Sequence, residues 1–188
     1  MTASCIDVLF IQGAGAGAHE ADGILAGALG QALGPGFRVH FPQLPNEGDP
    51  ANDVWEHAIS TALLDTHASI LVAHSAGAAI VADMLAQRVA DELAHLRGLF
   101  LLAPPFVGEG GWKLDGFHLD RVVDRGTLGE LRLQLYFGLA DTTVPPAHAE
   151  LYAKTFPDAA IQRLPGCDHQ FGGFMPRVAR DVQALAHA

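Results

Sequence analysis

The sequence is poor in cysteine and in basic residues, and both shortages narrow what the protein can be. Its two cysteines, Cys5 and Cys167, provide no disulfide framework for a chain of 188 residues, so we expect a reducing, cytoplasmic location. Eleven Lys and Arg residues stand against 21 Asp and Glu residues, and the formal net charge is −10. Nucleic acid and anionic membrane surfaces are therefore not expected as partners, because phosphate binding needs clustered Lys and Arg.

Long apolar runs and metal-binding motifs are also missing. The longest apolar stretches are interrupted by His74, Ser75 and Asp83 within about seventeen residues, which is too short and too polar for a membrane span. The run from Thr2 to Cys5 is not preceded by the basic and apolar segments of a signal peptide. No two histidines lie four residues apart around a carboxylate, and the cysteines are distant, so no metal or other cofactor is expected.

Strand-like and helix-like segments alternate along the chain, which is typical of a parallel sheet covered by helices on both faces. The expected strands span residues 7–11, 37–41, 69–73, 98–102, 133–137 and 161–164. The expected helices span residues 21–33, 50–64 with Asp49 as the cap, 76–89, 147–156 and 174–186. Without a repeat or linker, residues 1–188 are predicted to form one α/β domain, three layers around a six-stranded, mainly parallel sheet.

A serine interrupts an apolar strand just before a helical pattern, in the run Ala73-His74-Ser75-Ala76-Gly77. A serine that exposes its Oγ above a sheet lies on a sharp turn, and only small residues fit two positions before and after it. Ala73 and Gly77 meet this need, so Ser75 is a candidate nucleophile. The Ala76 N–H, in the first turn of the next helix, is a candidate oxyanion donor. An ordinary serine helix cap is the alternative interpretation.

Two further strand ends carry an acid and a histidine. Asp141 follows the strand at 133–137, and His169 follows the strand at 161–164. Taken alone, Asp141 could be a turn residue and His169 one of ten histidines. Along the chain the order is Ser75, Asp141, His169, which is the order of nucleophile, acid and histidine in α/β-hydrolases and differs from the orders in chymotrypsin and subtilisin. The three residues together therefore indicate a catalytic triad. Cys167 lies in no such turn and is interpreted as a packing or pocket residue.

These motifs resemble α/β-hydrolases, and most closely the compact, capless serine hydrolases related to retinoblastoma-binding protein nine. The shared features are Gln12-Gly13-Ala14-Gly15, His74 to Gly77, Leu102-Ala103-Pro104, Gly138 to Pro145, and Cys167-Asp168-His169. The resemblance implies that Ser75 is the nucleophile, His169 the base and Asp141 the residue that orients the base. It also implies the strand order 2-1-3-4-5-6. Gln12 and Ala73 depart from the family pattern, which often has histidine and glycine there.

The implied strand order creates a crevice between the first and third strands, where ligands gather in open α/β sheets. The loops after these strands contain Gly13-Ala14-Gly15 and Ser75. We therefore expect the second oxyanion donor to be the Ala14 N–H, with Gly13 and Gly15 allowing close backbone approach. Gly13, Gly15 and His74 are expected to line the substrate site, although the glycines would make a tight turn in either case.

Residues 104–130 are too few for a large cap domain but enough for a short flap. Phe106 and Trp112, with Val107 and Phe117, are expected either to line an apolar acyl pocket or to pack on the sheet. The expected reaction is cleavage of a small or medium-size carboxylic ester or thioester through an acyl-enzyme.

Two other functions are weighed against this hydrolase. Gly13 to Ala18 matches the dinucleotide pattern G-x-G-x-x-A, but Phe41-Pro42-Gln43 at the end of the second strand supplies no acid for a ribose hydroxyl. A non-catalytic interaction module could also use this fold. The complete set of Ser75, Asp141 and His169 favours the hydrolase over both. Protein partners cannot be inferred from the sequence.

Overall fold

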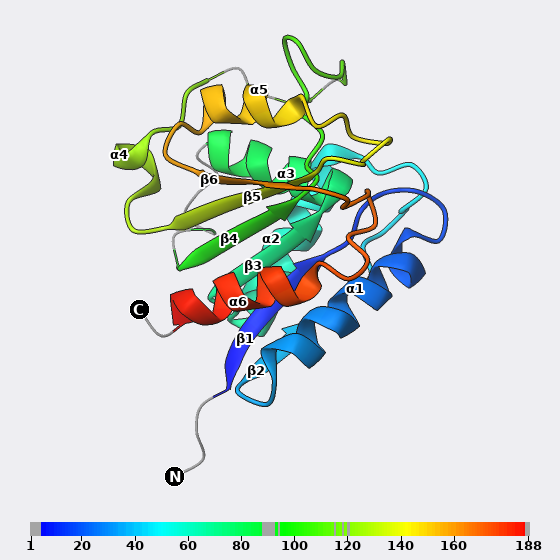
Figure 1. The fold of residues 1–188 in the computed structure, drawn as a ribbon, viewed down its shortest axis with the longest axis vertical. Helices are drawn as coiled ribbons and strands as arrows, with labels where there is room; N and C mark the ends of the chain where they lie inside the picture. The colour runs from blue at the N-terminus through cyan, green and yellow to red at the C-terminus, as the bar shows by residue number, and fades with distance from the viewer. Residues whose placement is uncertain are drawn as a thin grey trace.

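Six strands form one sheet in the order β2-β1-β3-β4-β5-β6, and every pair is parallel (Figure 1). The computed structural model describes residues 5–87, 93, 95–114, 116, 117, 119 and 121–186. The strands are β1 Ile6–Ile11, β2 Phe37–His40, β3 Ile70–His74, β4 Gly98–Leu102, β5 Arg132–Gly138 and β6 Ala160–Leu164. The predicted α/β fold class and strand order are confirmed, with a sheet that is parallel throughout.

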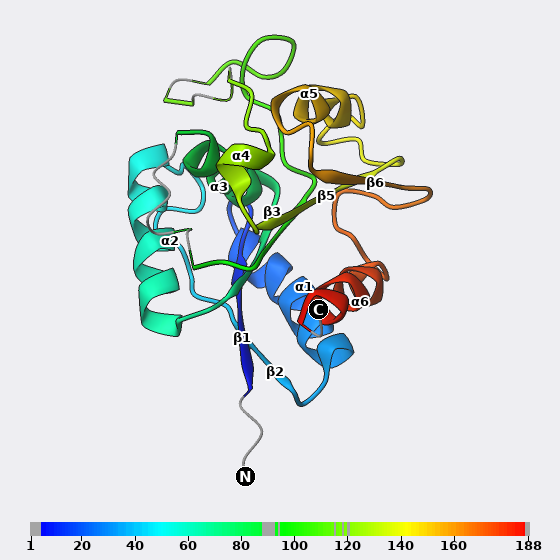
Figure 2. The ribbon, with the colours of Figure 1, turned by 90° about the vertical axis from the view of Figure 1, so that its left-hand side faces the viewer.

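Helices cover both faces of the sheet (Figure 2). One face carries α1 Ala18–Leu33 and α6 Met175–Ala186, and the other carries α2 Asn52–Thr66, α3 Ser75–Gln87 and α5 His148–Thr155. A single turn, α4 Arg125–Leu128, precedes β5 and was not predicted. Among the described residues, no helix is long and apolar enough to cross a membrane.

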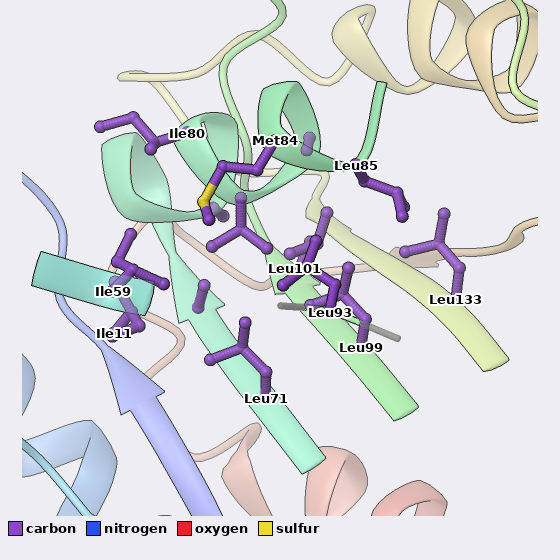
Figure 3. Packing of buried hydrophobic residues seen from close by; sticks show 14 of the residues in the cluster. Ile11, Ile59, Leu71, Ile80, Met84, Leu85, Leu93, Leu99, Leu101 and Leu133 are labelled. Atoms are coloured by element: carbon purple, nitrogen blue, oxygen red, sulfur yellow. The ribbon is translucent and has the colours of Figure 1, made fainter. Parts of the chain in front are cut away.

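The central strands are buried on both faces, as expected for a parallel sheet between two helical layers. Leu71, Leu99 and Leu101 point toward α2 and α3, where they pack with Ile80 and Met84 (Figure 3). The alternate residues of these strands pack instead with α1 and α6. Full burial of each such side chain contributes about 1.5–3 kcal/mol, so the sheet holds its loops on a rigid base.

Several helix ends differ from the predicted bounds, and two of the differences have a visible cause. α1 begins at Ala18 instead of residue 21, because a distant carboxylate described below binds its first N–H groups. The expectation that Asp49 and Pro50 start α2 is wrong, since Ala51 is the N-cap residue and the helix begins at Asn52. The expected end of the third helix, residues 88 and 89, lies outside the described residues.

Candidate active site

Ser75 occupies the sharp turn between β3 and α3, with a backbone φ of 50°. Residues with a side chain rarely adopt this left-handed conformation, which costs about 1–3 kcal/mol. Gly77 allows α3 to approach β1, since a Cβ at this position would lie 2.2 Å from the Gln12 carbonyl oxygen. Ala73 pairs with Ile11 and Leu101 and is fully buried, so the sheet accommodates its methyl group where the motif has glycine.

The loops after β3, β5 and β6 bring Ser75, Asp141 and His169 into one hydrogen-bonded series. His169 Nε2 lies 3.1 Å from Ser75 Oγ, and His169 Nδ1 lies 2.8 Å from Asp141 Oδ2. The other carboxylate oxygen, Asp141 Oδ1, accepts the N–H groups of Thr143 and Val144, each at 2.8 Å. These two bonds fix the buried carboxylate, so Oδ2 faces the imidazole. A hydroxyl, an imidazole and a carboxylate in this order can transfer the hydroxyl proton.

Close backbone contact joins the loops that carry Asp141 and His169. The Ala140 N–H donates to the Cys167 carbonyl oxygen at 2.9 Å. A Cβ at Gly138 would lie 2.4 Å from the same oxygen, so only glycine allows this approach. Burial raises the pKa of the Cys167 thiol to about 12, and the thiol is therefore protonated at neutral pH. Cys167 is fully buried, in agreement with its interpretation as a packing residue.

A buried carboxylate and imidazole, Asp22 and His74, link the glycine-rich loop to the loop of His169. Asp22 Oδ2 accepts the Gly13 N–H at 2.7 Å and lies 2.9 Å from His74 Nδ1. The second ring nitrogen, His74 Nε2, lies 2.9 Å from the His169 carbonyl oxygen. Both ring nitrogens of His74 lie within hydrogen-bond distance of protein oxygens, so both are already engaged within the protein. His74 borders the same hollow as Ser75, and its ring also connects Asp22 to the backbone of His169.

The glycine-rich loop is anchored at most of its N–H groups. The Gly15 N–H donates to the Glu47 carbonyl oxygen at 2.6 Å, and the Gly13 N–H is bound by Asp22. A Cβ at Gly13 would lie 3.0 Å from Ser75 Cβ, so the loop lies directly against Ser75. Between these anchors the Ala14 N–H has no hydrogen-bond partner in the described part of the chain. The Ala76 N–H belongs to the first turn of α3, whose N–H groups lack partners within the helix.

Glu47 fills the position where a dinucleotide-binding loop would hold pyrophosphate. Its carboxylate accepts the N–H groups of Gly17 and His19 at 2.9 and 2.8 Å, at the start of α1, and is bound by Gln12 Nε2 at 2.9 Å. These hydrogen bonds, the His19 N–H first, lower the pKa of Glu47. In dinucleotide-binding enzymes the pyrophosphate binds at the corresponding helix N-terminus. Because the Glu47 carboxylate already binds the N–H groups at the start of α1, the dinucleotide interpretation is disfavoured.

Two hollows lie near the start of α3, and Ser75 itself lines one of them. One, of about 330 Å³, is lined by Gly13 to Ala18, Ala21, Asp22, His74, Ser75, Thr143, His169 and Gln170. The other, of about 220 Å³, is lined by Pro50, Asn52, Ala76, Ala79, Ile80, Pro105, Val107, Trp112, Leu114 and Phe117. A hollow of about 610 Å³ at the amino ends of β4 and β5, beside Arg97 and Leu131, contains none of the candidate residues.

The two aromatic residues expected at the substrate site have different surroundings. Trp112 lines the hollow of about 220 Å³ and is 38% exposed. Phe106 lines neither hollow near the start of α3 among the described residues. It is buried and packs edge to face against Tyr152, with ring centres 5.3 Å apart. Phe106 therefore packs in the core, which is the alternative weighed for it above.

His148 fastens the flap to the start of α5. Its Nδ1 accepts the Phe106 N–H at 2.8 Å, and its ring meets Trp112 edge to face with centres 5.8 Å apart. Burial lowers the pKa of His148, partly opposed by the charge of Asp141. The ring is therefore neutral at neutral pH, and Nδ1 can act as an acceptor.

Acidification is expected to destabilise the protein through His148. Between the lowered folded pKa and the ordinary histidine pKa of about 6.5, the unfolded chain binds more protons, so the free energy of unfolding falls as the pH falls. Urea unfolding of the parent and of His148→Asn between about pH 7.5 and 5 measures this effect. Asparagine keeps a hydrogen-bond acceptor but does not titrate. The free energy of unfolding of His148→Asn should therefore fall less on acidification than that of the parent. Equal losses would contradict the assignment.

Family comparison identifies the chain. Residues 31–169 match the family model described as serine hydrolase, a span that contains Ser75 and Asp141 and ends at His169. The chain belongs to the serine hydrolase family. A comparison with curated proteins finds no match.

Solved structures similar to this serine hydrolase have the α/β-hydrolase fold. The esterase domain of a Rhodothermus marinus protein has 15% identity and a TM-score of 0.66, over 98% of this chain and 88% of that chain. A thioesterase of prodiginine biosynthesis from Streptomyces coelicolor has 17% identity and a TM-score of 0.65, over 97% and 91%. A CIB-like hydrolase from Thermoplasma acidophilum has 14% identity and a TM-score of 0.65, over 98% and 89%. The resemblance to α/β-hydrolases is thereby confirmed at the level of fold.

Sequence reasoning did not find four residues of this site: Asp22, Glu47, Thr143 and Gln170. Thr143 and Gln170 border the same hollow as Ser75, each within two residues of a predicted triad member. Asp22 is an acid in an otherwise Ala- and Gly-rich helix, which is the one local signal that could have marked it. Glu47 accepts the N–H of Gly17, which lies 30 residues away in the chain, and no local sequence pattern predicts such a contact.

Proposed function

We propose that this serine hydrolase cleaves small or medium-size carboxylic esters or thioesters by acyl transfer through Ser75. The hydrogen-bonded series from Ser75 through His169 to Asp141 is the observation that carries the proposal. The strained backbone of Ser75 supports it further. A non-catalytic interaction module would have no use for a serine held at a cost of about 1–3 kcal/mol.

In the proposed reaction, His169 Nε2 takes the Ser75 proton while Oγ attacks the substrate carbonyl carbon. The N–H groups of Ala14 and Ala76 stabilise the oxyanion that develops on the carbonyl oxygen. His169 then donates the proton to the leaving alcohol or thiol, which leaves an ester of Ser75 with the acyl group. Water then attacks this ester while His169 Nε2 takes its proton; the bond from Oγ to the acyl carbon breaks, His169 returns the proton to Ser75 Oγ, and the acid product departs. Asp141 keeps the proton of the neutral imidazole on Nδ1 throughout.

Labelling with a fluorophosphonate tests this assignment. The probe reacts with an activated serine by forming a phosphorus–oxygen bond and releasing fluoride, so mass spectrometry should find one adduct on the peptide containing Ser75. Ser75→Ala should remain unlabelled. Ser69→Ala is the matched control, since Ser69 lies just before the other end of β3, and it should label like the parent. Labelling that persists in Ser75→Ala, or a folded parent that never labels, would disprove the assignment.

A further inference from the structure

We infer that the hollow between the start of α3 and the flap binds the acyl group of the ester, and that this group is apolar and no larger than about a benzoyl or hexanoyl group. The inference rests on the proposed function. It deepens that function by assigning the two hollows near the start of α3 to the two halves of the substrate.

The hollow begins at the residue that follows Ser75 in the chain. Ala76 follows the nucleophile directly and lines the hollow, and Ala79 and Ile80 continue its wall along the same face of α3. The opposite wall comes from the flap, including Val107 and Trp112. Figures 1 and 2 both show the segment after β4 as a loop that projects from the body of the molecule. The hollow therefore adjoins the residue that follows Ser75, and the acyl group bonded to Ser75 Oγ would enter it past Ala76.

The side chains that line the hollow are mostly apolar. Among the described lining residues, Asn52 alone has a polar side chain. Its Nδ2 is already bound to Glu56 Oε1 at 3.0 Å and to the Gly116 carbonyl oxygen at 2.9 Å. Asn52 Oδ1 is buried without a hydrogen-bond partner among the described residues, and Trp112 adds one indole N–H. The rest of the wall is apolar, so most of the hollow suits a hydrocarbon group.

Volume sets the upper size of the acyl group. The hollow measures about 220 Å³. An apolar cavity of about 150 Å³ holds benzene, whereas sites for drug-sized ligands span about 300–1,000 Å³. One aromatic ring or a short alkyl chain fits this range, and a twelve-carbon chain does not.

The direction of the substrate follows from proton transfer. The leaving oxygen or sulfur must lie within hydrogen-bond distance of His169 Nε2 to receive its proton. His169 borders the hollow of about 330 Å³ and, among the described residues, does not border the apolar one. The alcohol or thiol half is therefore on the side of the glycine-rich loop, and the acyl half points toward Trp112.

A panel of 4-nitrophenyl esters that differ only in the acyl group tests the inference. For the parent, kcat/KM for butyrate, hexanoate and benzoate should exceed that for acetate by about tenfold or more, because each buried methylene can contribute a factor of this size. Laurate should fall back to the level of acetate or below. A parent without preference, or one that prefers laurate, would overturn the inference.

Two variants link the preference to this hollow. Trp112→Ala removes part of the wall at a partly exposed position, and Ala79→Leu fills the space from α3. Each should lower the ratio of benzoate to acetate kcat/KM by about tenfold. Val122→Ala, an exposed apolar residue of the same flap that is 67% exposed and lines neither hollow, should keep the parent ratio. If Ala79→Leu does not fold, Trp112→Ala alone decides.

The outcomes separate this inference from the proposed function. If Ser75 labels and acetate is hydrolysed but neither variant changes the ratio, the hollow does not bind the acyl group and the hydrolase proposal stands. If no ester of the panel is cleaved and Ser75 does not label, both proposals fail.

Discussion

Replacing Ser75 with alanine is expected to lower kcat for ester hydrolysis by about a millionfold, equivalent to about 8 kcal/mol of transition-state stabilisation. The reason is that Ser75 Oγ is the hydroxyl hydrogen-bonded to His169 Nε2, and the nearby Cys167 thiol, with its pKa raised to about 12, is a poor substitute. Steady-state kinetics with 4-nitrophenyl butyrate, together with thermal unfolding, measure the effect. The unfolding temperature should change little, because alanine keeps the Cβ of serine and removes only the hydroxyl.

Two controls make the result specific. Cys167→Ala should retain turnover within a few-fold, whereas a loss comparable to that of Ser75→Ala would point to the thiol as nucleophile. The double variant Ser75→Ala/His169→Ala should be no slower than Ser75→Ala alone, because members of a catalytic unit are not additive. A further large loss in the double variant would mean that His169 acts independently of Ser75.

Replacing Asp141 with asparagine is expected to lower kcat by about ten-thousandfold while leaving the fold intact. The retained amide oxygen can still accept the N–H groups of Thr143 and Val144. The amide nitrogen, however, would face His169 Nδ1 as a donor in place of Oδ2. The imidazole proton then moves to Nε2, and His169 can no longer accept the Ser75 proton.

Kinetics and thermal unfolding of Asp141→Asn test this tautomer argument. Asp168→Asn is the matched control, since this exposed carboxylate precedes His169 but bonds the Gln170 N–H at 3.1 Å instead of the imidazole. Asp168→Asn should have turnover close to the parent. Near-normal turnover of Asp141→Asn, or a loss explained by unfolding, would exclude the orienting role.

The fold was predictable because the six strands and the five longer helices each carry a local sequence signal, whereas the single turn α4 does not. The buried strands β3 and β4 are continuous apolar runs, and the helices between strands are amphipathic or small-residue segments of ordinary length. The loops at the carboxyl ends of parallel strands meet at one edge of the sheet. For that reason Ser75, Asp141 and His169 could be expected together from their positions after three strands.

Contacts between distant segments were not predictable. The start of α1 depends on Glu47, and the position of the glycine-rich loop depends on Asp22, yet neither acid belongs to a recognisable motif. The different surroundings of Phe106 and Trp112 could not be read from two aromatics six residues apart. Their burial depends on Tyr152 and His148, which come from α5.

The sequence by itself determined the succession of strands and helices along the chain. It also determined which strand ends carry Ser75, Asp141 and His169, and it supplied the small residues that the turn at Ser75 needs. These are properties of short segments, set by side-chain periodicity and backbone sterics. Only the tertiary structure decided which N–H groups remain unpaired beside Ser75 and which of the two hollows is mostly apolar. Those features depend on hydrogen bonds and packing between residues far apart in the chain, and such partners exist only once the chain has folded.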